Sequence, residues 1–281
     1  MRWQGGRTSG NVEDRRGLGP VGVGGLGVGG VVLALIGYFV FGISPDTTSQ
    51  VLGSGASQEQ HGQVGTPADE AGRFVDVIET STTDVWTPIF QQSGQRYTPP
   101  AGVVLYDQAT GTGCGLGQTA MGPFYCPNDQ KVYLDLAFWQ ELETRFGAKG
   151  DFARAYVIAH EIGHHVQQLQ GATDQADRMG AHGASSGSVR LELQADCYAG
   201  VWAAHAAQAS ANRITLDQGD IEQGMTAASS VGDDAIQAQT QGRVAPDSFT
   251  HGTSAQRMRW FRSGYQSGDP GACDTFHTSS L

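Results

Sequence analysis

Residues 21–43 form a largely apolar stretch of 23 positions without a charged side chain. As a helix rising 1.5 Å per residue, it would measure about 34 Å and would just span the hydrocarbon core of a bilayer. A removable signal peptide also has an apolar stretch, but it ends in a small-residue cleavage site. The sequence around Ile43-Ser44-Pro45 is a poor site of that kind. The pattern therefore predicts an uncleaved transmembrane helix over residues 21–43.

The segments on either side of this stretch are polar. Residues 44–72 consist mainly of Ser, Thr, Gln, Gly and Asp and hold few large apolar side chains. Such a segment cannot bury enough surface to offset its ordering entropy, so it is typical of a flexible linker. The glycine- and arginine-containing residues 1–20 predict a disordered head. The chain thus divides into a head (1–20), a membrane span (21–43), a linker (44–72) and a folded domain (73–281).

Beyond the linker, apolar residues follow first a helical period, then a strand period, then a helical period again. The segments with helical spacing are residues 69–92, 135–146, 151–170, 188–209, 217–231 and a last helix capped by Thr253 or Ser254 and running to Tyr265. Short strands are predicted over residues 103–106, 121–126 and 131–134. A small antiparallel sheet followed by helices indicates an α+β fold. The polar, Gly- and Ala-rich residues 171–187 predict a loop.

Composition and charge exclude one class of function. The chain has 41 glycines and a net charge of −11, and its acidity lies in the part after residue 20. Four arginines oppose two acidic residues before that point, and no basic run interleaved with aromatic residues follows. A nucleic-acid partner is therefore not expected. The arginine-rich head predicts a cytoplasmic N-terminus, and the domain behind the span would then lie outside the cytoplasm.

Four cysteines lie in the predicted domain, and in an extracytoplasmic protein an even count favours disulfides. Cys114 and Cys126 flank one predicted hairpin and form the natural local pair, which leaves Cys197 to pair with Cys273. Four cysteines allow three connectivities, and this is the one we expect. A zinc knuckle would need Cys-x-x-Cys spacing, which is absent. The glycine-rich residues 111–117 lack the Gly-Lys-Ser/Thr of a phosphate loop, so a hairpin turn is favoured there.

The strongest chemical signal is His160-Glu161-Ile162-Gly163-His164 on a predicted helix. Residues i and i+4 lie one above the other on a helix face, so both imidazoles can reach one metal ion. Zinc lowers the pKa of a bound water to about 7, and a carboxylate beside it can accept the proton and deliver it to a leaving amine. Glu161 has the position for that role. The motif alone predicts a zinc site with an activated water.

A catalytic zinc site needs a third protein ligand and an open position. The class with a third histidine six residues after His164 is excluded, because residues 167 and 170 are glutamines. Another class takes a Glu from a following helix, with an Asp one turn on. Glu192 and Asp196 match it, 28 residues after His164. Glu192 would bind the metal, and Asp196 would accept the free N–H of His160 and fix its tautomer.

At this point the sequence resembles a bacterial family of neutral zinc metallopeptidases. The resemblance rests on Ala-His-Glu-Ile-Gly-His-His-Val-Gln-Gln (159–168), Glu-Leu-Gln-Ala-Asp-Cys-Tyr-Ala-Gly-Val-Trp (192–202), Arg-Thr-Ser-Gly-Asn-Val-Glu-Asp-Arg-Arg-Gly (7–17) and Gly-Pro-Phe-Tyr-Cys-Pro (122–127). It covers nearly the whole chain, with the linker as the gap. It implies a single-pass membrane protein with a zincin-like domain of the gluzincin type, which carries one zinc ion.

Two further features follow from family patterns. Thr250–Arg257 is similar to the Thr-His-Pro-x-x-x-x-Arg stretch of membrane-bound CaaX-type metalloproteases, although Gly252 replaces the proline. His251 and Arg257 could then stabilise the oxyanion of a peptide undergoing hydrolysis. In zincins an edge strand beside the active-site helix pairs with an extended peptide. The resemblance suggests the strand with Gly122, Phe124 and Tyr125 for that task, stiffened by the bridge from Cys126.

These features predict a membrane-anchored zinc endopeptidase that acts on peptides or proteins outside the cytoplasm. Two alternatives stay open from sequence: a non-catalytic, zinc-stabilised binding module, and a zinc amidase acting on cell-wall peptides. A structural zinc site would more often close its fourth position with Cys or His, which disfavours the binding module. The residues alone do not separate a protease from an amidase.

Overall fold

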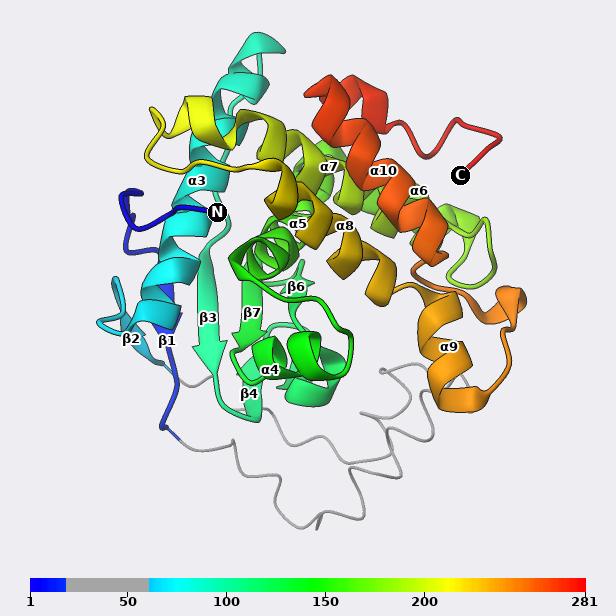
Figure 1. Cartoon of the computed structure of the whole chain (residues 1–281), viewed down its shortest axis with the longest axis horizontal. Helices are drawn as coiled ribbons and strands as arrows, with labels where there is room; N and C mark the ends of the chain where they lie inside the picture. The colour runs from blue at the N-terminus through cyan, green and yellow to red at the C-terminus, as the bar shows by residue number, and fades with distance from the viewer. Residues whose placement is uncertain (19–60) are drawn as a thin grey trace.

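The computed structural model describes residues 1–18 and 61–281, and the membrane span predicted over residues 21–43 lies outside them (Figure 1). Within the described residues, a five-stranded sheet has the order β2-β1-β3-β7-β6. β1, β3 and β7 run parallel, and β2 and β6 flank them antiparallel. The strands are β1 (Val12–Asp14), β2 (Gln63–Val64), β3 (Gly102–Tyr106), β6 (Phe124–Cys126) and β7 (Lys131–Asp135). β4 (Ala109–Thr112) and β5 (Gly115–Gln118) form a separate hairpin.

The sheet thus corrects one prediction and confirms another. A small antiparallel sheet was expected, but its three central strands are parallel. The error arises because β1 comes from the segment assigned to the head, and a β1–β3 pair cannot be recognised from local pattern. The glycine-rich residues 111–117 form the hairpin turn that was predicted, between β4 and β5.

Eight α-helices complete the described part of the α+β domain. The helices predicted over residues 151–170 and 188–209 are confirmed, and Thr253 caps the last helix through a capping box with Gln256. The helices are α3 (Glu70–Gln92), α4 (Phe138–Thr144), α5 (Asp151–Gln170), α6 (Ala172–Met179), α7 (Gly187–Ala209), α8 (Gln218–Ser230), α9 (Asp233–Gln241) and α10 (Ser254–Ser267).

The loop predicted over residues 171–187 is wrong in its first half, which is α6. Ala172 and Ala176 are buried one turn apart, so a short apolar stripe holds this otherwise polar helix. α9 was not predicted either, because only Asp233 and Gln237 of its residues are buried. Both helices are short, with eight and nine residues, and polar in composition, so they were not recognised from sequence.

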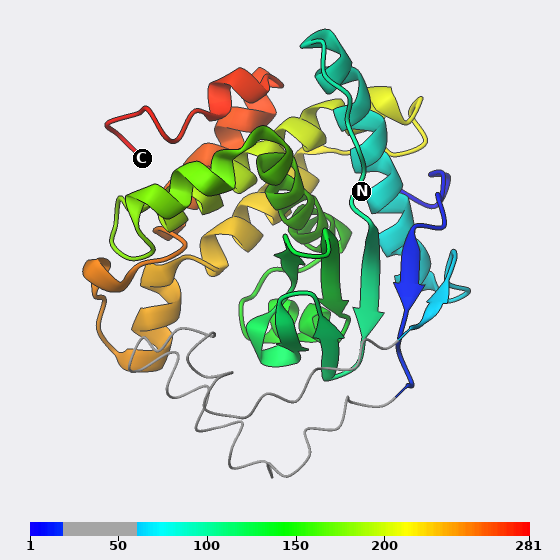
Figure 2. The same cartoon turned by 180° about the vertical axis from the view of Figure 1, so that it is seen from behind.

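Alternate residues of the sheet enter two different cores. Val103 and Leu105 of β3 join the main core with α3, α5 and α7. Val104 and Tyr106 point to the opposite face and pack with Tyr133 and Cys126 in a smaller cluster. This is the period of two expected of a pleated strand. Figure 2 shows α3 lying alongside β1 and β3, so the helices cover one face of the sheet.

The prediction of a disordered head is wrong, because residues 1–18 are part of the domain. Val12 is fully buried and pairs with Val103, and Trp3 lies in the main core. The backbone N–H groups of Ser9 and Gly10 donate to the buried carboxylate of Asp76 on α3. The linker predicted to residue 72 is also too long, since β2 and the start of α3 lie within it.

This arrangement limits the membrane topology. A single crossing by residues 21–43 would place residues 1–18 and 61–281 on opposite sides of the bilayer. β1 is hydrogen-bonded to both β2 and β3, so residues 1–18 and 61–281 belong to one folded domain. Such a crossing would separate β1 from both of its partner strands. Among the residues that the structure describes, no helix is long and apolar enough to cross a bilayer.

Glycines let the helices that carry the candidate site approach closely. A Cβ atom at Gly163 on α5 would lie 3.2 Å from the carbonyl oxygen of Ala195 on α7. A Cβ at Gly264 on α10 would lie 1.9 Å from the carbonyl oxygen of Cys197 on α7, which no side chain tolerates. Small residues at these crossings therefore bring α5, α7 and α10 together at one place.

Candidate metal centre

The two helices that meet at Gly163 bring three potential ligands together. His160 and His164 project from α5 and Glu192 from α7, and their ligand atoms all lie within 4.8 Å of one another. Nε2 of His160 is 3.2 Å from one oxygen of Glu192, and Nε2 of His164 is 3.5 Å from the other. Both imidazoles therefore aim the same nitrogen at the same carboxylate. The structure brings together the three residues predicted from sequence as metal ligands.

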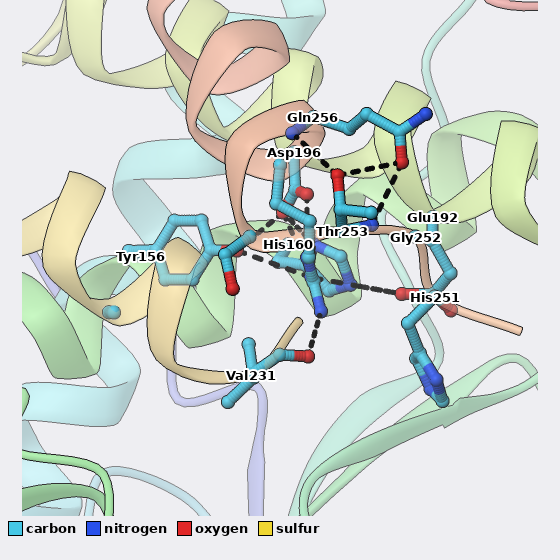
Figure 3. A network of polar contacts seen from close by, with 12 residues as sticks. Tyr156, His160, Glu192, Asp196, Val231, His251, Gly252, Thr253 and Gln256 are labelled. Carbon is cyan, nitrogen blue, oxygen red and sulfur yellow. Dashed lines mark hydrogen bonds and ion pairs between the residues drawn. The ribbon is translucent and has the colours of Figure 1, made fainter. Parts of the chain in front are cut away.

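A buried ion pair orients His160 from behind. Nδ1 of His160 donates to Asp196, 2.9 Å away, as predicted. Asp196 is fully buried and also accepts hydrogen bonds from the guanidinium of Arg257 (2.8 and 3.0 Å) and from the hydroxyl of Tyr156. Figure 3 shows Tyr156 and Asp196 on one side of His160 and Glu192, with His251 nearby, on the other. Asp196 thereby leaves the lone pair of the neutral imidazole on Nε2 of His160, the nitrogen that faces Glu192.

Arg257, expected from sequence to stabilise an oxyanion, has its guanidinium hydrogen-bonded to Asp196. The residue is 3% exposed, and its guanidinium donates to Asp196, to the hydroxyl of Tyr156 and to the carbonyl of Val231. It therefore balances the buried charge of Asp196, and it also lies 3.8 Å from a carboxylate oxygen of Glu192. The motif that placed Arg257 on a late helix is correct about its position, but sequence carries no information about which way the side chain turns.

Electrostatics at the centre favour binding of a cation. Burial alone lowers the pKa of His160, but its hydrogen bonds to Asp196 and Glu192 outweigh burial and raise that pKa to about 10. Burial raises the pKa of Glu192, yet the charges of His251 and His164 hold it well below its usual range. His160 thus holds a proton tightly, because the neighbouring carboxylates stay ionised. A metal ion competing for the same nitrogen would displace that proton.

Glu161 is beside the ligands and has no polar partner. It follows His160 on α5 and is 7% exposed. Among the described residues, no side-chain hydrogen bond or ion pair engages its carboxylate, which contrasts with Glu192 and Asp196. A carboxylate in this state is free to exchange a proton with a water or a substrate atom in the site.

His251 reaches the site from the segment between α9 and α10. Its Nδ1 lies 2.8 Å from the hydroxyl of Thr250 and 3.3 Å from a carboxylate oxygen of Asp233. The other oxygen of Asp233 accepts the backbone N–H groups of residues 250, 251 and 252. Burial lowers the pKa of His251, but the charge of Glu192 and the contact with Asp233 outweigh it and raise the pKa. His251 is thus held beside Glu192 with Nε2 available.

Gly252 explains a departure from the related motif. Its φ is +88°, a left-handed conformation that proline cannot adopt. The turn that carries His251 therefore differs locally from one with proline at this position, while the histidine still reaches the site.

The strand proposed to bind substrate lies at an edge of the sheet and touches the ligand helix. β6 pairs with β7 on one side only. The hydroxyl of Tyr125 lies 3.0 Å from Nδ1 of His165, whose Nε2 donates to the carbonyl of Thr98, 2.7 Å away. His165 therefore ties β6 to α5. Phe124 stacks on Tyr133 and faces the smaller cluster, so β6 offers its backbone, not this ring, to a ligand.

Both predicted disulfides are present. Cys114 bridges Cys126 at the end of β6, and Cys197 of α7 bridges Cys273 behind α10. The first attaches the β4–β5 hairpin to the edge strand, and the second holds the chain end against the helix that carries Glu192. Covalent links thus brace both sides of the centre.

Sequence reasoning missed two side chains that support the site. Gln167 was used only to exclude a third histidine, yet its carbonyl oxygen is 2.8 Å from Nδ1 of His164. His165, to which the sequence assigns no role, is fully buried and contacts Tyr125 of β6 and the carbonyl of Thr98. Both residues lie on the ligand helix within three residues of His164, which was the available indication. Spacing alone, however, does not predict which atoms they contact.

Comparison with known proteins gives consistent results. Residues 1–276 match the model of the family described as "Putative neutral zinc metallopeptidase". Protein YpfJ of Escherichia coli is 47% identical over 296 residues, which cover 99% of this chain and 100% of the relative. Protein Rv2575 of Mycobacterium tuberculosis is 47% identical over 223 residues, 75% of this chain and 74% of the relative. No solved structure matches the chain.

Proposed function

The chain belongs to this family of neutral zinc metallopeptidases, and from that premise we propose that it is a zinc-dependent endopeptidase. The observation that carries the proposal is the convergence of His160, His164 and Glu192 beside an unpaired Glu161. Two imidazoles and one carboxylate are the donor set of gluzincin-type catalytic zinc sites, which leave a position open. Nε2 of His160, Nε2 of His164 and the carboxylate oxygens of Glu192 face one another, and these are the types of ligand atom that zinc binds.

The chain's own residues supply the other parts of the mechanism. Zinc held by the three ligands would polarise the peptide carbonyl and lower the pKa of water. Glu161 would accept the proton of the attacking water on its carboxylate and pass it to the nitrogen of the leaving amine. His251, held through Nδ1, would donate from Nε2 to the oxygen of the scissile carbonyl as negative charge develops there. Asp196 keeps His160 in its ligating tautomer throughout.

The peptide would be held along the free edge of β6. An extended peptide can add to an exposed edge through main-chain hydrogen bonds, which place its backbone at a fixed depth. Gly122 precedes the strand with φ of +72°, and the contact of Tyr125 with His165 fixes the strand against α5. Recognition of backbone rather than of side chains supports an endopeptidase of broad sequence tolerance.

The test is Glu161→Gln, with Glu143→Gln on the exposed face of α4 as the matched control. Glu161→Gln should bind zinc like the wild type and lose about 10²–10⁴-fold in peptide hydrolysis, the usual contribution of a general base. Glu143→Gln should change neither. Undiminished hydrolysis by Glu161→Gln would eliminate the mechanism. Zinc binding without turnover of any peptide by the wild type would favour a non-catalytic binding module, and turnover restricted to purified wall material would favour an amidase.

We also propose that the domain acts outside the cytoplasm. The two disulfides support this location, because such bonds persist in oxidising compartments. Membrane association through residues 21–43 is part of the proposal, under the constraint that residues 18 and 61 remain on one side. Protease digestion of intact and permeabilised cells tests it: digestion of the domain only after permeabilisation to the cytoplasm would contradict the location.

A further inference from the structure

A chain of amide hydrogen bonds leads from His164 away from the metal centre. Nδ1 of His164 lies 2.8 Å from Oε1 of Gln167, which is fully buried. Nε2 of Gln167 donates to the carbonyl oxygen of Leu191 (2.7 Å) and to Oε1 of Gln194 (3.1 Å). Nε2 of Gln194 in turn donates to the carbonyl oxygen of Cys273, 3.0 Å away. These hydrogen bonds thus link α5, α7 and the short helical segment after α10 (Pro270–Cys273).

The carbonyl of Cys273 determines which group donates and which accepts in each of these hydrogen bonds. A backbone carbonyl only accepts, so the carbonyl of Cys273 requires the NH₂ group of Gln194 and turns its Oε1 toward Gln167. The NH₂ group of Gln167 then meets two acceptors, and its own oxygen must face His164. An amide oxygen can only accept. Nδ1 of His164 therefore carries hydrogen, and in the neutral imidazole Nε2 keeps the lone pair.

We propose that Gln167 and Gln194 are positioning residues that hold His164 in the Nδ1–H tautomer, with Nε2 ready to bind the metal. The inference rests on the proposed zinc site but not on peptide hydrolysis. Asp196 does the same for His160 with a charged group, whereas His164 is oriented by neutral amides. His160 is thus oriented by an anionic side chain and His164 by a neutral one. This difference limits the negative charge buried at the centre.

The hydrogen-bonded amides of Gln167 and Gln194, called the relay below, end at the segment that carries the second disulfide. Cys273 is fully buried and bonded to Cys197 on α7, so its carbonyl is fixed relative to Gln194 on the same helix. A cavity of about 380 Å³ lies against this end of the relay and is lined in part by Gln194, Cys273 and Phe276. Both amides are hydrogen-bonded to one another, to His164 or to backbone carbonyls, which fits a positioning role better than a ligand-binding one.

The experiment compares zinc affinity and histidine tautomer in three variants. Gln167→Met and Gln194→Met remove the amides at similar length, and Gln170→Met is the control, because Gln170 lies one turn on along α5 and its amide oxygen accepts from the hydroxyl of Tyr198 instead of contacting His164. Zinc affinity is measured by competition with a chromophoric chelator. The tautomer of His164 is measured by nitrogen-15 NMR of the zinc-free protein at alkaline pH, with His164→Asn for assignment. Thermal unfolding of each zinc-free variant monitors the fold.

Gln167→Met should weaken zinc binding about 10- to 100-fold, as removal of a ligand's hydrogen-bond partner usually does, and should release His164 into a mixture of tautomers. Gln194→Met should act in the same direction but less, since Leu191 still holds Gln167. Combining the two should add little to Gln167→Met alone. Should Gln167→Met not fold, Gln194→Met carries the test by itself. Wild-type affinity with an unchanged Nδ1–H tautomer in the folded variants, or losses matched by Gln170→Met, would overturn the proposal.

Discussion

Removing the guanidinium of Arg257 tests whether this residue is a buried counter-ion rather than a group that contacts substrate. In Arg257→Met, Asp196 loses two charged hydrogen bonds of 2.8 and 3.0 Å while remaining fully buried. The hydroxyl of Tyr156 and the carbonyl of Val231 also lose a partner. Breaking a buried pair by removing one member costs about 3–5 kcal/mol, because the remaining charge is uncompensated. We expect a loss of that size in the free energy of unfolding.

The assay is urea unfolding of the zinc-free, oxidised protein, followed by tryptophan fluorescence. Arg259→Met on the same helix is the control: its side chain is exposed and contacts Ser280, the chain end and the ring of Trp260, so a change within about 0.5 kcal/mol is expected. The double variant with Asp196→Leu should be less destabilised than the sum of the single variants, since no buried charge is then left alone. A loss below 1 kcal/mol for Arg257→Met would refute the counter-ion role.

Three further predictions concern Glu13, Gly163 and His251. Hydrogen bonds from Arg15, Gly62 and Lys131 outweigh the effect of burial and lower the pKa of Glu13 from 4.5 to about 2. The folded-state pKa is the lower one, so the carboxylate stabilises the fold above pH 4.5, and this contribution is lost as the pH falls toward 2. Glu13→Gln should thus lower the free energy of unfolding by about 1–3 kcal/mol at pH 7 and by nothing near pH 2, which urea titrations at several pH values would measure. Gly163→Ala should cost about 1–3 kcal/mol and weaken zinc binding, because the new methyl separates α5 from α7; unchanged chelator competition would contradict this. His251→Gln should keep zinc and lower kcat about 10²–10³-fold, and equal turnover in steady-state assays would exclude its role at the carbonyl oxygen.

The ligands could be predicted from sequence because the helix converts spacing into direction. His160 and His164 are four residues apart, which places them on one face of any α-helix. Glu192 lies on a separate helix, and only the pairing with Asp196 one turn on made it recognisable. Both contacts predicted for this pair, with the histidines and with Nδ1 of His160, are present. Local periodicity was sufficient wherever a single helix carried the geometry.

The first strand could not be predicted for the opposite reason. β1 has three residues, and its stability comes from pairing with β3, which lies about ninety residues away along the chain. Glycines and charges around it are typical of a disordered segment, yet Arg15 is buried and donates to Thr110 and Gly111, and the backbone N–H of Ser9 donates to the buried Asp76 of α3. Composition reports only whether a segment can fold by itself. It carries no information about a segment that folds onto another.

The same limit applies to the groups that orient the centre. Gln167, Gln194 and Arg257 are ordinary polar residues in the sequence, and each acquires its role from the partner it meets across two helices. Residue type at the ligand positions was informative because few side chains bind zinc. For the supporting residues many types would serve, and the close approach at Gly163 determines which of them meet.

The most direct test of the account is an anomalous difference map recorded at the zinc absorption edge from crystals of the wild-type protein grown with zinc. The account predicts one strong peak within bonding distance of Nε2 of His160, Nε2 of His164 and a carboxylate oxygen of Glu192, about 2.0–2.2 Å from each. It also predicts that Nδ1 of the two histidines remains on Asp196 and Gln167. A zinc peak bound elsewhere, or a peak that leaves Glu192 uncoordinated with a fourth protein ligand in its place, would contradict it.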